Sequence, residues 1–363
     1  MRRRVAHLVL SDGTRFEGEA AGSLLEGGDA SGEVVFNTAL SGYQEVMTDP
    51  SYAGQVVTFT YPHIGNYGVS DLDDESAGAH LAGVVVRDLP SLHSNWRSEG
   101  SLEAFLIEHD VPAITGIDTR RLTRHLRDSG ALPGAFGTSS VDELTEMARV
   151  ARGTDGQDLA TVVSTRERYS LGQGPFTVVA LDLGVKRTIL RYLAGFASVE
   201  VVPASTSADE ILSLNPDGLF LSNGPGDPGA LGGVQETVEA LLGKLPIFGI
   251  CLGHQVLASA LGGETFKLPF GHHGSNHPVK NLRTGHVEVT AQNHNYAVVD
   301  GSIPGAEVTH VNLNDGVIEG ISVASADAFS VQHHPEAGPG PHDAAYLFED
   351  FERRLQQVKA ARS

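Results

Sequence analysis

A continuous apolar run in the second half of the chain, Phe176–Leu181, constrains the fold more than any other feature. Such runs are typical of strands buried on both faces of a parallel sheet. Helical and strand patterns then alternate with short loops, at Thr188–Leu193, Val199–Val202, Gly218–Leu221 and Gly233–Gly243. Alternating strands and helices require right-handed crossovers, so the sequence predicts a doubly wound α/β sheet. In such sheets the active site lies at the carboxyl ends of the strands.

The first half of the chain has a different pattern, richer in strands. Leu8–Leu10 and Thr14–Gly18 flank an Asp-Gly pair, which indicates a β-hairpin because this pair tolerates positive φ. A Gly- and Pro-containing break at Leu171–Pro175 indicates the end of a linker. We therefore expect a mixed, strand-rich α/β domain with its linker over residues 1–172, and the doubly wound domain over residues 173–363.

Several helices have clear start signals. Asp118 is expected to cap a helix that ends near Gly130. Capping boxes, in which a serine is followed three residues later by a glutamate, begin at Ser140 and at Ser207. These signals are local, so they predict where helices begin without reference to the rest of the fold.

Composition excludes several classes of function. The chain has 25 Lys and Arg against 45 Asp and Glu, a formal net charge of −20, which disfavours nucleic acids and anionic membranes as partners. The longest stretch without Asp, Glu, Lys or Arg, Leu245–Gly263, contains Pro246 and four glycines, and it predicts a strand, a turn and a helix. The N-terminal segment has arginines at positions 2–4 but no apolar core of signal-peptide length before Asp12. We expect a cytoplasmic protein without a membrane span.

Cys251 is the only cysteine, which excludes an intrachain disulfide and a thiolate zinc cluster; no metal site is predicted. It stands in Gly249-Ile250-Cys251-Leu252-Gly253, between an apolar strand and the start of a helix. This is the nucleophile-elbow pattern, in which glycines are required because the nucleophile occupies a sharp, strained turn. The helix N-terminus also favours a thiolate. A lone cysteine is usually an inert core residue, but the two glycines and the strand–turn–helix context favour a nucleophile.

A cysteine nucleophile needs a base and a group that orients the base. His334 and Glu336 stand two residues apart, and in an extended segment such residues face the same side. Glu336 can therefore steady the imidazole of His334, as in a catalytic triad. The same alternation places His333 on the opposite side. A surface loop at the end of a strand is the alternative interpretation.

The loop Leu221–Pro228 follows a strand and is too rich in Gly and Pro to form a helix. Its free backbone N–H groups can line an oxyanion hole beside the cysteine. The loop lacks the lysine and the glycine spacing of a phosphate-binding loop, and no Gly-x-Gly-x-x-Gly follows a strand. No nucleotide site is therefore predicted in this chain.

Taken together, these motifs resemble those of a known protein family. Residues 223–228 (Asn-Gly-Pro-Gly-Asp-Pro), 249–255 (Gly-Ile-Cys-Leu-Gly-His-Gln) and 334–336 (His-Pro-Glu) occur in the order and spacing of class I (triad) glutamine amidotransferases. The resemblance extends over nearly the whole chain to the small-chain family of carbamoyl-phosphate synthases, through Gly271–Val279, Thr290–His294, Phe36–Glu45 and Thr48–Tyr52. Other class I amidotransferases lack this N-terminal domain.

The resemblance implies an enzyme that hydrolyses L-glutamine. Cys251 would attack the side-chain carbonyl and form a glutamyl thioester, His334 would transfer protons, and Glu336 would orient His334. The backbone N–H groups of Leu252 and Gly226 would bind the oxyanion. Contacts with glutamine are implied for Ser51, Gly224, Gln255, Asn293, Asn295 and Tyr296. Asn295 departs from the family pattern, since many relatives have Gly there.

The resemblance also implies a partner, the large chain of carbamoyl-phosphate synthase. That chain would use ATP, Mg²⁺ and bicarbonate with ammonia from this chain, and the carbamoyl phosphate would serve arginine and pyrimidine synthesis. This chain itself is expected to need no cofactor. The alternatives are an amidotransferase subunit of another synthase, a stand-alone cysteine hydrolase of γ-glutamyl compounds, and an idle regulatory subunit. The N-terminal domain disfavours the first, and the complete set of Cys251, His334 and Glu336 disfavours the last.

Overall fold

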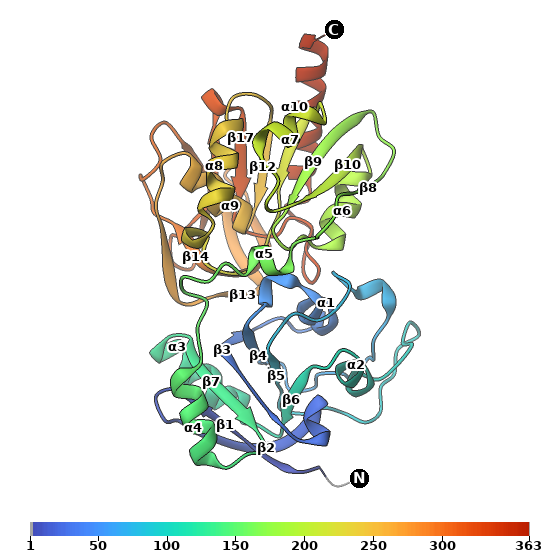
Figure 1. Cartoon of the computed structure of the whole chain (residues 1–363), viewed down its shortest axis with the longest axis vertical. Helices are drawn as coiled ribbons and strands as arrows, with labels where there is room; N and C mark the ends of the chain where they lie inside the picture. The colour runs from blue at the N-terminus through green and yellow to red at the C-terminus, as the bar shows by residue number, and fades with distance from the viewer. Residues whose placement is uncertain (1–2, 363) are drawn as a thin grey trace. The chain divides into compact units, whose positions relative to one another are not determined.

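The computed structural model describes residues 3–362 (Figure 1). Arg2, part of the arginine-rich N-terminal segment, lies outside the described residues. The chain divides into two compact units: the first runs to Asp155 and includes Pro269–His273, and the second comprises Gly156–Leu268 and the chain from Gly274. This division precedes the expected boundary near residue 172, because β8 (Tyr169–Leu171) is the edge strand of the sheet in the second unit.

The first unit contains a closed β-barrel with the strand order β1-β2-β6-β5-β4-β3-β7. The strands are β1 Val5–Leu10, β2 Arg15–Gly22, β3 Asp29–Asn37, β4 Gln55–Phe59, β5 Gly83–Val85, β6 Pro112–Thr115 and β7 Leu132–Gly137. β1 and β2 form the expected hairpin, with Val9 opposite Arg15. Pairing of β1 with β7 closes the barrel. The expected strand-rich α/β fold is confirmed, whereas barrel closure was not predicted.

Helices cover the strands of the first unit. They are α1 Tyr43–Thr48, α2 Leu102–Glu108, α3 Thr119–Ser129 and α4 Val141–Val150, with 3-10 turns η1 Ser23–Glu26, η2 Pro50–Tyr52 and η3 Asp71–Asp73. Successive residues of the strands enter different cores, as the two-residue period of a strand requires. Val35 and Val57 pack in the cluster that contains α1 and α2, while Val34 and Val56 pack in another cluster with Phe136.

The second unit is built on a sheet with the strand order β14-β13-β15-β16-β17-β12-β11-β9-β10-β8. Its strands after β8 are β9 Phe176–Asp182, β10 Ala197–Pro203, β11 Gly218–Leu221, β12 Ile247–Ile250, β13 Thr265–Asn281, β14 Val287–Val298, β15 Glu307–Asn312, β16 Ile318–Val323 and β17 Ala328–Val331. β10, β9, β11, β12 and β17 are parallel neighbours, so the predicted doubly wound sheet is confirmed. β15 and β16 extend it in antiparallel pairing, which was not predicted.

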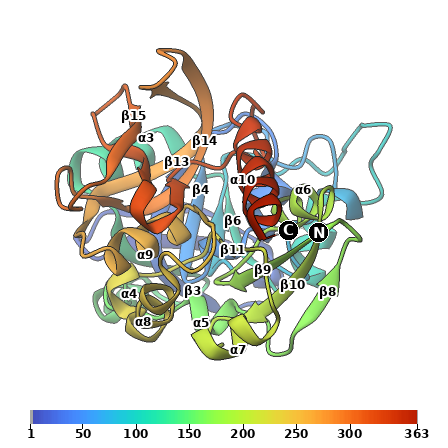
Figure 2. The same cartoon turned by 90° about the horizontal axis from the view of Figure 1, so that it is seen from above.

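Helices lie on both faces of this sheet (Figure 2). They are α5 Ala160–Val163, α6 Arg187–Ala194, α7 Ala208–Ser213, α8 Gly232–Leu241, α9 Leu252–Ala260 and α10 Tyr346–Arg362, with 3-10 turns η4 Pro228–Ala230 and η5 Ala324–Ala326. α7, α8 and α9 pack in one core cluster, and α6 and α10 pack in the other. Within the described residues, no helix combines the length and the apolar character needed to cross a membrane.

The predicted helix starts are confirmed. The side chain of Asp118 accepts a hydrogen bond from the N–H of Arg121 at the start of α3. Both capping boxes are complete, that of Ser140 at α4 and that of Ser207 at α7.

Candidate active site

Cys251 occupies a sharp turn between β12 and α9. Its φ of 55° and ψ of −106° lie in a region that non-glycine residues rarely adopt, at a cost of about 1–3 kcal/mol. The flanking glycines are required by the backbone around them. A Cβ at Gly253 would stand 2.2 Å from the carbonyl oxygen of Leu221, and a Cβ at Gly249 would stand 2.7 Å from that of Gly253. The local structure is therefore the strained strand–turn–helix that the sequence predicts.

His334 and Glu336 follow β17, the parallel neighbour of β12. The N–H of His334 donates to the carbonyl of Ala291 on β14 at 2.9 Å, which fixes the backbone. Nδ1 of His334 is hydrogen-bonded to Oε1 of Glu336 at 2.7 Å, and both residues are buried. His333 faces away, with its Nδ1 3.6 Å from Oε2 of the buried Glu319. The side chains thus alternate as the sequence indicates.

The charges in this site favour a protonated imidazole. Burial alone would lower the pKa of His334, but the charges of Glu336 and Cys251 raise it to about 10. Burial likewise opposes ionisation of Glu336, but the charges of Lys186 and His334 lower its pKa to about 2. The sulfur of Cys251 lies 3.3 Å from the carbonyl oxygen of Asn293. The structure therefore brings Cys251, His334 and Glu336 together in one buried cluster.

Lys186 also belongs to this cluster, although no sequence motif indicated it. Its Nζ lies 2.9 Å from Oε1 of Glu336 and donates to the carbonyl of Ala337 at 2.6 Å. Its side chain is 2% exposed, so it forms a buried ion pair. The available signal was its position shortly after β9, at the carboxyl end of a parallel strand, where active sites of such sheets lie.

The predicted oxyanion residues lie at the carboxyl ends of β11 and β12, which are parallel neighbours. Leu252 is the first residue of α9, so its N–H has no acceptor within the helix. Gly224 and Gly226 lie in the loop after β11. A Cβ at Gly224 would stand 2.0 Å from the carbonyl oxygen of Leu183, and Gly226 has a φ of 96°. Both positions therefore require glycine for the loop to adopt this path.

The other residues with implied glutamine contacts occupy three places. Asn293, Asn295 and Tyr296 lie on β14, and Asn295 is half-buried. Gln255 lies on α9, where its Nε2 donates to the carbonyl of Tyr296 at 2.8 Å and to Oε1 of Gln332 at 3.0 Å. Ser51 belongs to η2 in the first unit, where its N–H donates to Asp49. Its implied role stays a prediction.

A thiol on a strained turn, an imidazole and a carboxylate that orients it are the groups required for acyl transfer through a cysteine. Comparison with known proteins agrees with this chemistry. Residues 179–353 match the family model "Glutamine amidotransferase class-I". The second unit is therefore a class I glutamine amidotransferase domain, and the predicted fold class is confirmed.

The first unit gives the more specific assignment. Residues 8–136 match the family model "Carbamoyl-phosphate synthase small chain, CPSase domain". The carbamoyl phosphate synthase small chain of Syntrophotalea carbinolica is 50% identical, covering 95% of this chain and 96% of its own length. That of Escherichia coli K12 is 48% identical and covers 98% of both chains. A solved glutamine amidotransferase from Thermotoga maritima covers 52% of this chain and 86% of its own, with 18% identity and a TM-score of 0.36.

This chain belongs to the carbamoyl-phosphate synthase small-chain family. It is an enzyme whose amidotransferase domain carries the glutaminase activity of that synthase. The predicted family and enzyme class are confirmed.

Proposed function

We propose that this chain hydrolyses L-glutamine through a cysteine thioester and delivers the ammonia to the large chain of carbamoyl-phosphate synthase. The observation that carries the proposal is the buried cluster of Cys251, His334 and Glu336 on a strained elbow, in a chain of this family. The cluster contains a nucleophile, a proton carrier and an orienting carboxylate, so glutamine hydrolysis in this chain needs no cofactor.

In the first half of the reaction, His334 holds the proton of Cys251, and the thiolate sulfur attacks the side-chain carbonyl carbon of glutamine. The resulting oxyanion accepts hydrogen bonds from the N–H groups of Leu252 and Gly226. The carbon–nitrogen bond then breaks, and His334 gives its proton to the departing nitrogen, which leaves as ammonia. A glutamyl thioester remains on Cys251.

In the second half, His334 removes a proton from water while the water attacks the thioester carbonyl. The carbon–sulfur bond breaks, the sulfur leaves as a thiolate beside the protonated His334, and glutamate leaves. Glu336 is hydrogen-bonded to Nδ1 of His334 at 2.7 Å, and in this proposal that bond orients the ring in both halves of the reaction. Lys186 neutralises Glu336, so we propose that it is a positioning residue for the pair.

The glutamine contacts follow from the family resemblance. We propose that substrate contacts are made by residues from the loop after β11, from α9, from β14 and from η2, namely Gly224, Gln255, Asn293, Asn295, Tyr296 and Ser51. The 3.3 Å contact between the sulfur of Cys251 and the carbonyl oxygen of Asn293 supports the part of this set on β14.

The small-chain family implies a heterodimer with a large chain. In this proposal the large chain binds ATP and Mg²⁺ and makes carbamoyl phosphate from bicarbonate and ammonia, for arginine and pyrimidine synthesis. We also propose a cytoplasmic location, since a nucleophilic thiol must remain reduced and the cytosol keeps thiols reduced.

The test is to co-purify the chain from its native cell and to assay the complex with glutamine, ATP and bicarbonate. We expect a large chain in the complex and carbamoyl phosphate formed from glutamine. The competing function, a stand-alone γ-glutamyl hydrolase, predicts glutamate release at full rate without any partner and no synthesis with one. That result would contradict the proposal.

A further inference from the structure

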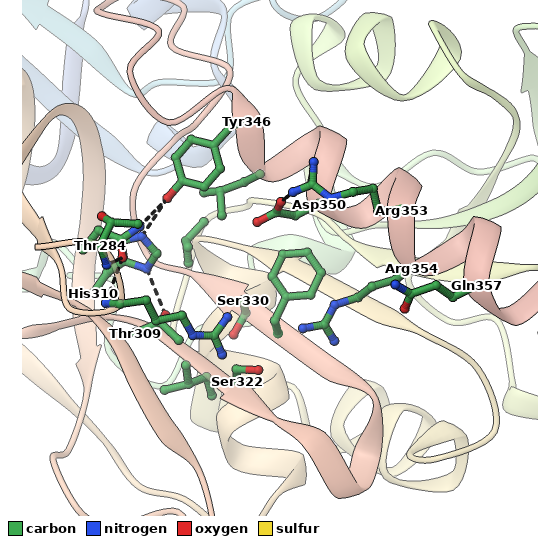
Figure 3. Close-up of a pocket in the computed structure, with 16 residues that line it drawn as sticks. Thr284, Thr309, His310, Ser322, Ser330, Tyr346, Asp350, Arg353, Arg354 and Gln357 are labelled. Atoms are coloured by element: carbon green, nitrogen blue, oxygen red, sulfur yellow. Dashed lines mark hydrogen bonds and ion pairs between the residues drawn. The ribbon is translucent and has the colours of Figure 1, made fainter. Parts of the chain in front are cut away.

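A cavity of about 470 Å³ lies between α10 and the strands β15, β16 and β17 in the second unit (Figure 3). Tyr346 and His310 stand on one side of it, and Arg353 and Arg354 stand on the other. Arg283, from the turn after β13, also lines it. The lining contains neither Cys251 nor His334, so the cavity is separate from the amidotransferase site.

The lining of this cavity contains more arginines than carboxylates. Three arginines line it, Arg283, Arg353 and Arg354, and Asp350, the one carboxylate among the lining residues, is paired with Arg353. The chain as a whole has a formal net charge of −20. Because each of these arginines is paired with a carboxylate, an anion would bind here through the N–H donors that the pairs leave unused, and not through a net positive charge.

The guanidinium groups are held in place but keep donors free for a ligand. Arg283 donates to both carboxylate oxygens of Glu307, at 2.9 and 2.7 Å, and Nη1 of Arg354 donates to Asp327 at 3.2 Å. Neither carboxylate lines the cavity. A guanidinium has five N–H donors, and these contacts use only some of them. The carboxylates therefore orient two arginines without filling the space between them.

Polar side chains in the lining of the cavity are held by hydrogen bonds. Nε2 of His310 lies 3.1 Å from the hydroxyl of Tyr346, and the same hydroxyl donates to Oε1 of Glu288 at 3.0 Å. Ser330 is fully buried, and its Oγ lies 2.8 Å from Nδ1 of His254 on α9. These contacts fix the polar side chains of the lining before any ligand binds.

We propose that this cavity binds a small oxyanion, a phosphate or carboxylate group, between Arg283, Arg353 and Arg354. Planar guanidinium groups bind such oxygens through paired N–H donors, and arginine is the preferred residue for this task. The proposal does not depend on the glutaminase reaction, because it concerns binding at residues that take no part in that chemistry.

Isothermal titration of the full chain without glutamine tests the proposal, with inorganic phosphate in one series and succinate in the other. Sodium chloride keeps the ionic strength equal. We expect saturable binding of at least one anion, and the arm that saturates identifies the ligand as a phosphate or a carboxylate. Arg283→Gln and Arg353→Gln should each weaken binding about tenfold or more, because each removes charge-assisted hydrogen bonds.

Arg149→Gln is the matched control. Arg149 is exposed and paired with Glu146 three residues earlier, as Arg353 is with Asp350, but it lies on α4 in the first unit. Unchanged glutamine hydrolysis verifies that each variant is folded. The proposal is overturned if neither anion binds saturably, or if Arg149→Gln weakens binding as much as the cavity variants do.

Discussion

At the residue scale, the two adjacent histidines after β17 have different surroundings. His334 is hydrogen-bonded to Glu336, and the charge of Cys251 raises its pKa, whereas His333 lies beside Glu319. His334→Asn should lower kcat for glutamine by about 10²–10⁴-fold, the usual contribution of a positioned acid–base group. His333→Asn should lower stability and leave kcat within a few-fold, because its contact is structural. Steady-state kinetics and urea unfolding measure both. Equal loss of kcat at unchanged stability would remove the distinction.

The buried pair of Lys186 and Glu336 makes a prediction about acid stability. The pKa of Glu336 is about 2 instead of the ordinary 4.5, so the pair stabilises the fold above about pH 4.5 and this stabilisation is lost as the pH falls toward 2. Lys186→Met removes the largest charge that lowers this pKa. The pKa should rise, and the loss should begin at higher pH.

At neutral pH, Lys186→Met should lower the free energy of unfolding by about 3–5 kcal/mol, the cost of breaking a buried pair. Urea unfolding across the pH range measures both effects. Lys244→Met, at an exposed position, is the control. The role assigned to Lys186 is wrong if both variants have the same free energy of unfolding and the same pH dependence.

At the scale of elements, the elbow depends on close packing of α9 against β11. Gly253→Ala places a methyl group 2.2 Å from the carbonyl oxygen of Leu221, so α9 must shift. We expect a loss of about 1–3 kcal/mol in stability and a large loss of glutaminase activity, since the shift moves Cys251. Thermal melts and activity assays measure them. Gly233 occupies the same second position in α8, and a Cβ there meets nothing within 4 Å. If Gly233→Ala is equally harmful, crowding at the elbow is not the cause.

Elements with local signals were predictable from the sequence. The caps at Asp118, Ser140 and Ser207, the β1–β2 hairpin and the elbow around Cys251 depend on residues within a few positions of one another. Closure of the barrel depends on pairing β1 with β7, and the ion pair of the site joins Lys186 to Glu336 across 150 residues. Such contacts depend on the tertiary fold, so no local sequence pattern predicts them.

At the scale of the whole molecule, the proposal separates glutamine hydrolysis from carbamoyl phosphate synthesis. Cys251→Ser removes the sulfur, so the complex with the large chain should lose glutamine-dependent synthesis. Free ammonia bypasses the thioester, so ammonia-dependent synthesis should survive. Assays of the same preparation with each nitrogen source measure both. Loss of both activities in a folded complex would show that Cys251 has another role.

In the proposed mechanism, Cys251 carries the glutamyl group between the two halves of the reaction. Acid quenching of the chain during glutamine turnover, followed by mass spectrometry of the peptide that contains Cys251, tests it most directly. We expect a glutamyl adduct on Cys251 in the wild-type chain during turnover and none in Cys251→Ala. Two results would contradict this mechanism. One is an active wild-type chain that shows no adduct in a quench known to preserve thioesters. The other is a Cys251→Ala chain that still hydrolyses glutamine at the wild-type rate.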